Sequence, residues 1–170
     1  EGVTNIGDGA FTSGNVPMSY SEIKFPKTLK SIEMDAFKNN DSVTEINLPD
    51  GLESIGTYAF EKNTSLVKVS FGDGITELSD GVFSRDKLLK NISLPYGLKS
   101  IGKNVFAENN SLEELYISET VENIQSSMLG NVKSTVTIYS SRNDASGYNS
   151  AAYDYVDILP IFSKKPYHQV

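Results

Sequence analysis

Cysteine and tryptophan are absent from this chain of 170 residues, and histidine occurs once, at His168 near the C-terminus. Without cysteine the chain has no disulfide, no thiol nucleophile and no cysteine-ligated metal centre. One histidine in a tail cannot build a histidine-rich zinc site, and it leaves a serine nucleophile elsewhere without its usual base. We therefore expect no enzyme, no metal site and no cofactor.

Long hydrophobic runs are also missing. No stretch approaches the roughly 20 apolar residues that a membrane-spanning helix needs, and the first residues lack the basic start and apolar core of a secretory signal. The formal net charge is −7, with acidic and basic residues interspersed along the chain. Such a balance disfavours binding to nucleic acid or to an anionic membrane. We expect neither a nucleic-acid partner nor direct membrane insertion.

Two weaker signals for chemistry have simpler explanations. Residues 72–76 contain two glycines but lack the lysine of a phosphate-binding loop, so the glycines mark a turn. Glu113, Glu114 and Glu119 lie close together in the sequence, as a hydrolytic pair of carboxylates could. Charges of this kind usually belong to a solvated face, and we assign them no catalytic role.

A strict repeat dominates the sequence. Aromatic residues recur every 23 residues, and a leucine continues the series: Phe37, Phe60, Phe83, Phe106 and Leu129. Aliphatic residues keep the same interval five residues before each of these, at Ile32, Ile55, Leu78, Ile101 and Ile124. Chance clustering does not hold several columns in one register over this length. The pattern indicates a solenoid in which no single coil buries its apolar face and stacking buries it instead.

Each repeat has an interpretable local structure. Residues 44–48 alternate polar and apolar side chains, which is typical of a half-buried strand. A turn follows, and the Ala/Val-Phe pair then fills the interior. A polar turn residue recurs three positions after each aromatic, at Asn40, Asn63, Asp86 and Asn109. Side chains of this kind can hydrogen-bond exposed backbone groups of their own coil and of the neighbouring coil.

One coil carries the motif Leu52-x-x-Ile55-Gly56-x-x-Ala59-Phe60-x-x-Asn63-x-x-Leu66-x-x-Val69-x-Phe71. This motif resembles the BspA-like leucine-rich repeat, also called the Treponema pallidum type, over roughly residues 3–140. The family often has cysteine where this chain has Asn40, Asn63 and Asn109, a difference that preserves the turn role.

Repeat and resemblance together predict the fold class. We expect an α/β-type repeat solenoid, a right-handed leucine-rich-repeat coil with short parallel strands, a 23-residue period and few or no long helices. The resemblance implies a bacterial cell-surface or secreted protein that binds, or adheres to, a host or microbial surface protein or a glycan. The alternative is a structural spacer that presents other domains and has no ligand of its own.

We divide the chain into three parts: a solenoid of about five and a half coils at 1–140, a C-terminal cap at 141–162 and a flexible tail at 163–170. Within the cap, residues 148–155 predict a short helix with Ser150 as its N-cap, and residues 158–162 predict a final extended segment.

The N-terminal end is less regular. The first coil matches the second at a spacing of 26 residues, so we expect three extra residues within 12–19. Val3 already lies in mid-repeat register, and the chain shows no N-terminal cap. We therefore expect an N-terminally incomplete solenoid whose first coil can associate end to end with another copy.

The candidate binding face follows from the strand alternation, because neighbours of the buried strand residues point outward. They form two columns across the stacked coils. We assign the candidate face to Lys24, Asn47, Lys68, Ser70, Asn91, Ser93, Glu114, Tyr116 and Tyr139. Tyr116 and Tyr139 are the best anchors, since tyrosine combines a large contact area with a hydrogen-bonding tip. The alternative is that the two tyrosines only cover the last coils.

Overall fold

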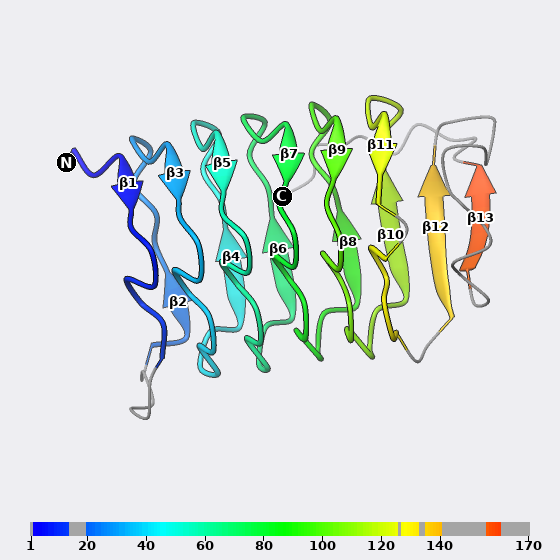
Figure 1. Ribbon diagram of the computed structural model, residues 1–170, viewed down its shortest axis with the longest axis horizontal. Coiled ribbons are helices and arrows are strands. Elements are labelled where there is room, and N and C mark those ends of the chain that lie inside the picture. Colours follow the sequence, from blue (N-terminus) through cyan, green and yellow to red (C-terminus); the bar gives the residue numbers. More distant parts are fainter. Residues whose placement is uncertain (1, 14–19, 126, 133–134, 141–155, 161–170) are drawn as a thin grey trace.

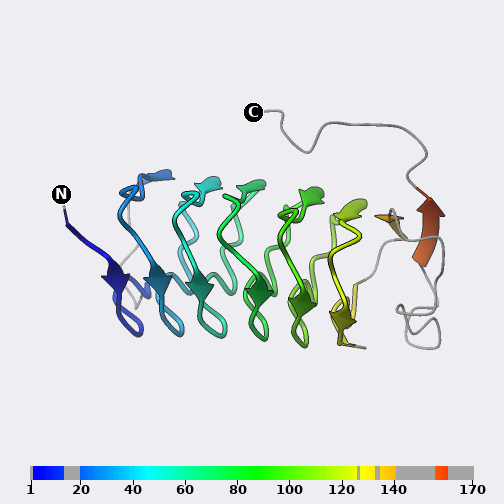
Figure 2. The same cartoon turned by 90° about the horizontal axis from the view of Figure 1, so that it is seen from above.

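The computed structural model describes residues 2–13, 20–125, 127–132, 135–140 and 156–160. These residues form a stack of coils that advances along one axis, with one row of short strands along each of two sides (Figures 1 and 2). Every strand pair in the described residues is parallel, and these residues contain no helix. The predicted fold class is confirmed: the chain is a leucine-rich-repeat solenoid.

The strands of one row are two residues long. They are β1 (Asn5–Ile6), β3 (Ser31–Ile32), β5 (Ser54–Ile55), β7 (Glu77–Leu78), β9 (Ser100–Ile101) and β11 (Asn123–Ile124). The strands of the other row lengthen toward the C-terminus. They are β2 (Glu22–Ile23), β4 (Glu45–Asn47), β6 (Lys68–Ser70), β8 (Asn91–Ser93), β10 (Glu114–Ile117), β12 (Val136–Ser140) and β13 (Val156–Pro160). We name each coil after its phenylalanine: the Phe60 coil contains β5 and β6, and the Phe83 coil contains β7 and β8.

The strand register agrees with the sequence period. Ile46 pairs with Val69, 23 residues on, and Ile6 pairs with Ile32, 26 residues on. The longer first interval is the one expected from extra residues within 12–19. The segment 14–19 itself lies outside the described residues.

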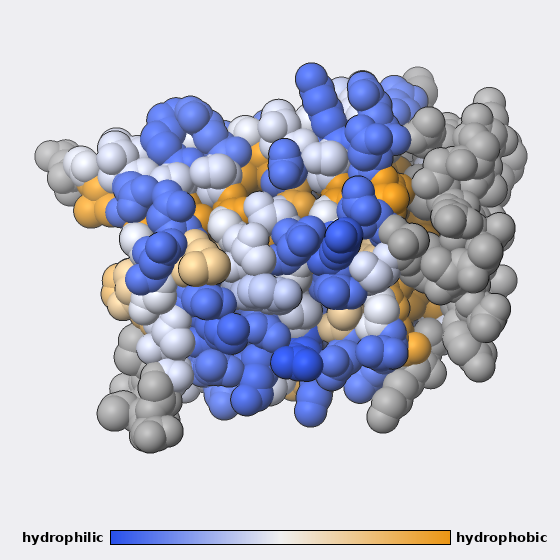
Figure 3. All heavy atoms as spheres, viewed as in Figure 1, coloured by the Kyte–Doolittle hydropathy of each residue, from blue (hydrophilic) through white to orange (hydrophobic). Residues whose placement is uncertain are grey.

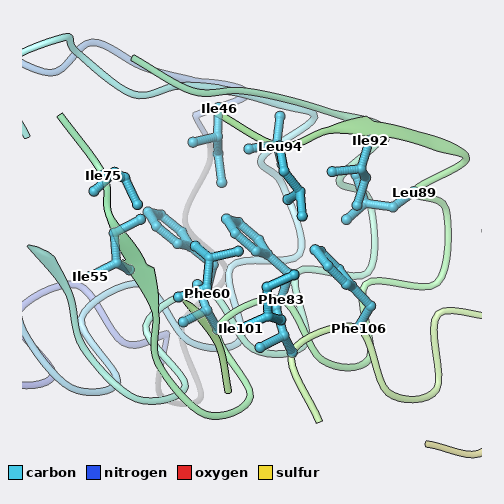
Figure 4. Packing of buried hydrophobic residues seen from close by; sticks show 14 of the residues in the cluster. Ile46, Ile55, Phe60, Ile75, Phe83, Leu89, Ile92, Leu94, Ile101 and Phe106 are labelled. Carbon is cyan, nitrogen blue, oxygen red and sulfur yellow. The ribbon is translucent and has the colours of Figure 1, made fainter. Parts of the chain in front are cut away.

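A stack of phenylalanine rings fills the interior. Ring centroids lie 5.1 Å apart for Phe11 and Phe37, 5.3 Å for Phe37 and Phe60, 5.5 Å for Phe60 and Phe83, and 6.2 Å for Phe83 and Phe106. The planes of these pairs differ by at most 11°. Phe60, Phe83 and Phe106 are fully buried, and their rings lie one behind another among aliphatic side chains (Figure 4). The aromatic column therefore lies inside the coil, as the period predicts. On the coloured part of the face shown in Figure 3, hydrophilic residues predominate, with smaller hydrophobic patches between them.

The two strand rows are interrupted at the same place. One row divides into the sheets β1-β3-β5 and β7-β9-β11, and the other into β2-β4-β6 and β8-β10-β12-β13. Among the described residues, no strand pair therefore joins the Phe60 coil to the Phe83 coil. Backbone hydrogen bonds on the turn side span this junction, from the N–H groups of Tyr58, Phe60 and Lys62 to the carbonyl groups of Asp80, Val82 and Ser84, at 3.0, 3.0 and 2.8 Å. We call it the Phe60–Phe83 junction; the sequence period does not predict it.

The C-terminal cap is only partly described. Strand β13 pairs in parallel with β12, from Val136 with Val156 to Ser140 with Pro160. It overlaps the extended segment expected at 158–162 but begins two residues earlier. The helix expected at 148–155 and the tail at 163–170 lie outside the described residues, so the domain limits 1–140 and 141–162 stay predictions.

The N-terminal coil leaves apolar side chains uncovered. Val3 is 52% exposed and Phe11 is 42% exposed, whereas Phe60 in the equivalent position of a later coil is fully buried. End-to-end association through this coil stays a prediction. None of the described residues forms a helix long and apolar enough to cross a membrane.

Candidate binding surface on the longer strands

The two predicted columns lie on the row of longer strands. Parallel pairing aligns Glu22 with Glu45 and Lys68, and it aligns Asn91 with Glu114 and Thr137. In the second column, pairing aligns Asn47 with Ser70, and Ser93 with Tyr116 and Tyr139. Backbone pairing is interrupted between Lys68 and Asn91, at the Phe60–Phe83 junction.

All nine candidate residues reach the surface. Lys24, Asn47, Lys68, Asn91 and Ser93 are exposed, and Ser70, Glu114, Tyr116 and Tyr139 are half-buried. The strand residues between them, such as Ile46, Ile92 and Leu115, are buried. The period-two alternation of a strand places the two sets on opposite sides of the sheet. The structure brings the candidates together on one face, and their role in binding stays a prediction.

Tyr116 and Tyr139 form a stacked pair that shares one carboxylate. Their ring centroids lie 4.5 Å apart with planes inclined by 9°. The Tyr116 hydroxyl donates to Oε2 of Glu114 at 3.1 Å, and the Tyr139 hydroxyl donates to Oε1 of the same carboxylate at 3.5 Å. Burial raises the pKa of Tyr116 to about 12, with the Glu114 hydrogen bond and charge adding to the shift. Its hydroxyl therefore stays protonated at neutral pH and keeps donating.

On the side toward β8, the stack meets a small side chain. Tyr139 covers one face of the Tyr116 ring, and the residue paired with Tyr116 on the other side is Ser93. A serine side chain is too short to cover a tyrosine ring, and the same column continues with Ser70 in the next coil. An aromatic face thus borders a shallow strip of hydroxyl and amide groups, to which Asn91 also belongs.

The sequence placed Glu114, Tyr116 and Tyr139 on the candidate face, but it did not predict the hydrogen bonds from the two hydroxyls to the Glu114 carboxylate. The available signal was the two-residue spacing of Glu114 and Tyr116, which places both side chains on the same face of one strand.

Two other polar surfaces are present. A hollow on the row of short strands is lined by Glu77, Asp80, Ser100, Ile101, Gly102, Lys103, Asn123 and Gln125. Sequence reasoning did not identify it. Within the part of the chain that the structure describes, no three acidic, histidine or cysteine residues are grouped as a metal site would need.

The second is a row of ion pairs along the turns. Glu61 is 7% exposed and pairs with Lys38 at 2.8 Å and with Arg85 at 3.1 Å. Arg85 also pairs with Glu108 at 3.2 Å in the next coil. These charges are engaged with one another across successive coils, which gives them a structural role.

Stacked coils of parallel strands, one buried aromatic column and a broad polar face define a leucine-rich-repeat protein. The family model for the BspA type leucine rich repeat region matches residues 4–136 in six copies. The chain belongs to this family, as its motif indicates. A search of curated protein sequences finds no significant match.

Solved structures of bacterial proteins are similar to this chain. A leucine-rich cell surface protein from Faecalibacterium prausnitzii A2-165 is 28% identical with a TM-score of 0.72, over 82% of this chain and 35% of that one. A leucine-rich repeat protein from Bacteroides ovatus is 28% identical with a TM-score of 0.63, over 93% of this chain and 43% of that one.

A leucine-rich repeat protein from T. pallidum is 22% identical with a TM-score of 0.62, over 78% of this chain and 64% of that one. At this identity the likeness shows the fold alone. The chain spans less than half the length of the F. prausnitzii and B. ovatus proteins.

Proposed function

We propose that this chain is a binding module of a bacterial cell-surface or secreted protein, and that it recognises a protein or a glycan of a host or microbial surface through the longer strands. The observation that carries the proposal is the Tyr116–Tyr139 stack, which is held by Glu114 and open toward Ser93. The family and the cell-surface protein of F. prausnitzii support the location.

The physical case rests on preorganisation. Rings that are already stacked and hydrogen-bonded lose little conformational freedom when a ligand docks, so more of the contact energy remains as affinity. A solenoid face is broad and shallow, which suits an extended protein segment or oligosaccharide better than a small cofactor. The carboxylate of Glu114 is engaged by the tyrosine hydroxyls, which favours a positioning role over catalysis.

Ligand screening with a matched tyrosine pair tests the proposal. The chain is screened against arrays of host-matrix proteins and of oligosaccharides, and hits are measured by calorimetry. We expect Tyr116→Ala to weaken binding about tenfold or more, as removal of an aromatic anchor does. Tyr96, which is 51% exposed and lies outside the two columns, is the control: Tyr96→Ala should leave the affinity unchanged.

A hit on the protein array or on the oligosaccharide array shows which class of ligand the chain binds. Equal losses of affinity in Tyr116→Ala and Tyr96→Ala would place the contact elsewhere on the molecule. Absence of any specific ligand in both arrays would favour the structural spacer over the binding module.

A further inference from the structure

A row of buried polar side chains links the coils on the turn side. The backbone N–H of Asn40 donates to Oδ1 of Asn63 at 2.7 Å, that of Asn63 to Oδ1 of Asp86 at 2.7 Å, and that of Asp86 to Oδ1 of Asn109 at 2.9 Å. All four side chains are at most 1% exposed. These are the contacts with neighbouring coils that the recurrent turn asparagines predict. Asp86 is the one ionisable residue of the four.

The second atom of the side chain distinguishes Asp86 from Asn40 and Asn63, whereas Nδ2 of Asn109 is buried without a hydrogen-bond partner, as Oδ2 of Asp86 is. Nδ2 of Asn40 donates to the Phe37 carbonyl at 2.8 Å, and Nδ2 of Asn63 donates to the Phe60 carbonyl at 2.6 Å. Asp86 has Oδ2 in the corresponding place, and this buried atom has no hydrogen-bond partner. The corresponding carbonyl of its own coil belongs to Phe83. An ionised Asp86 would set an unpaired charge against an acceptor, whereas a protonated one would supply the missing donor.

The surrounding charges do not compensate an ionised Asp86. Besides Asp86, the charged side chains within residues 61–65, 84–88 and 107–111 are Glu61, Lys62, Arg85, Lys87 and Glu108. Arg85, the cation adjacent in sequence, pairs with Glu61 and Glu108. Burial raises the pKa of Asp86 well above its usual range; the hydrogen bond from Asn63 opposes this shift and the negative charge of Glu61 adds to it.

We propose that Asp86 keeps its proton in the folded solenoid at neutral pH, that its Oδ2–H donates to the Phe83 carbonyl, and that this proton makes the Phe60–Phe83 junction sensitive to pH. The location matters because, in the described residues, neither row of strands pairs across this junction. The bond from Asn63 N–H to Asp86 is one of the turn-side contacts that remain.

The sign of the pH dependence follows from linkage. The folded-state pKa lies above the unfolded one, so the folded chain binds more protons between the two values. The contribution of Asp86 to the free energy of unfolding is highest below the ordinary carboxyl pKa. It falls as the pH rises toward the raised value and stays at its lower level above that.

Replacement with the residue found in the neighbouring coils tests the proposal. Asp86→Asn supplies the amide donor without a titratable group, as Asn63 does in the preceding coil. We expect its chemical unfolding midpoint to exceed that of the parent chain at neutral pH, and the two midpoints to converge near the ordinary carboxyl pKa. The mirror variant Asn63→Asp should show a lower midpoint at neutral pH and recover in acid.

A direct measurement accompanies the stability curves. The side-chain carboxyl carbon of Asp86, assigned in NMR spectra by its loss in Asp86→Asn, should show the protonated chemical shift at neutral pH. An ordinary aspartate titration, or a stability difference between the two chains that does not vary with pH, would overturn the proposal.

Hydrogen exchange tests the part that concerns the junction. The amide of Lys62 donates to the Ser84 carbonyl across the junction, and the amide of Asn39 makes the equivalent bond to the Glu61 carbonyl one coil earlier. After correction for intrinsic rates, protection of the Lys62 amide should fall with rising pH more than that of Asn39, and this difference should vanish in Asp86→Asn. Equal pH dependence at both amides in the parent chain would overturn the link between the proton and the junction.

Discussion

At the scale of single residues, the phenylalanine column has the clearest energetic consequence. Phe60 stacks between Phe37 and Phe83 and is fully buried. Phe60→Ala should lower the free energy of unfolding by about 3–5 kcal/mol, because it removes apolar contacts and leaves a cavity between two rings. Denaturant unfolding monitored by circular dichroism measures this loss.

Phe11 provides the matched control for that measurement. It stacks on Phe37 at the end of the column and is 42% exposed, so Phe11→Ala should cost much less. An unchanged midpoint for Phe60→Ala would contradict the buried position of the column.

Residue patterns predicted contacts better than they predicted charge states. The interval of the turn asparagines indicated side chains that bond to their own and to neighbouring coils, and the bonds of Asn40 and Asn63 confirm it. In that pattern Asp86 is simply equivalent to asparagine. Its unusual position becomes visible only from its complete burial and the unpaired Oδ2, since both depend on the coils stacked on either side.

At the scale of elements, successive coils approach too closely at Gly56 to leave room for a side chain. A Cβ added to Gly56 would lie 2.5 Å from the Glu33 carbonyl carbon and 2.5 Å from the Met34 nitrogen. Both are backbone atoms of the preceding coil, which cannot rotate away. Gly56→Ala should lower the free energy of unfolding by about 1–3 kcal/mol, the usual cost of overpacking.

Gly97 serves as the control for Gly56. A Cβ there would meet only the Asp73 carbonyl oxygen, at 3.4 Å, an ordinary contact distance. Thermal unfolding of Gly97→Ala should therefore resemble that of the parent chain. Equal losses for the two variants would show that glycine flexibility, and not coil spacing, determines the cost.

Strand alternation predicted the candidate face, including its two columns and the alignment of Tyr116 with Tyr139. It did not predict the Phe60–Phe83 junction, where both rows lose their pairing. A period specifies which residues are equivalent, whereas hydrogen bonds between strands depend on small differences in distance and angle between coils.

At the scale of the whole molecule, the apolar side chains exposed on the first coil of the described residues predict self-association of this chain. Val3 and Phe11 are exposed at the first coil, where β1 is the edge strand of its sheet. Sedimentation equilibrium should give an average mass that increases with protein concentration. Phe11→Glu should keep the chain monomeric, because it places a charge in the apolar contact.

Leu88→Glu is the control for this experiment. Leu88 is 47% exposed and lies in the middle of the stack, so the variant adds the same charge away from the end. It should associate like the parent chain. A parent chain that remains monomeric at every concentration, or equal behaviour of the two variants, would contradict the end-to-end contact.

The sequence by itself determined the repeat, the inward and outward sides of each strand, the aromatic column and the candidate face, because these depend only on the period and on strand alternation. Only the tertiary structure decided which atoms meet between coils: the Glu114 bonds that hold Tyr116 and Tyr139, the interrupted pairing at the Phe60–Phe83 junction, and the buried Oδ2 of Asp86. These features depend on distances of a few ångströms and on exclusion of water by neighbouring coils, and a one-dimensional pattern does not contain them.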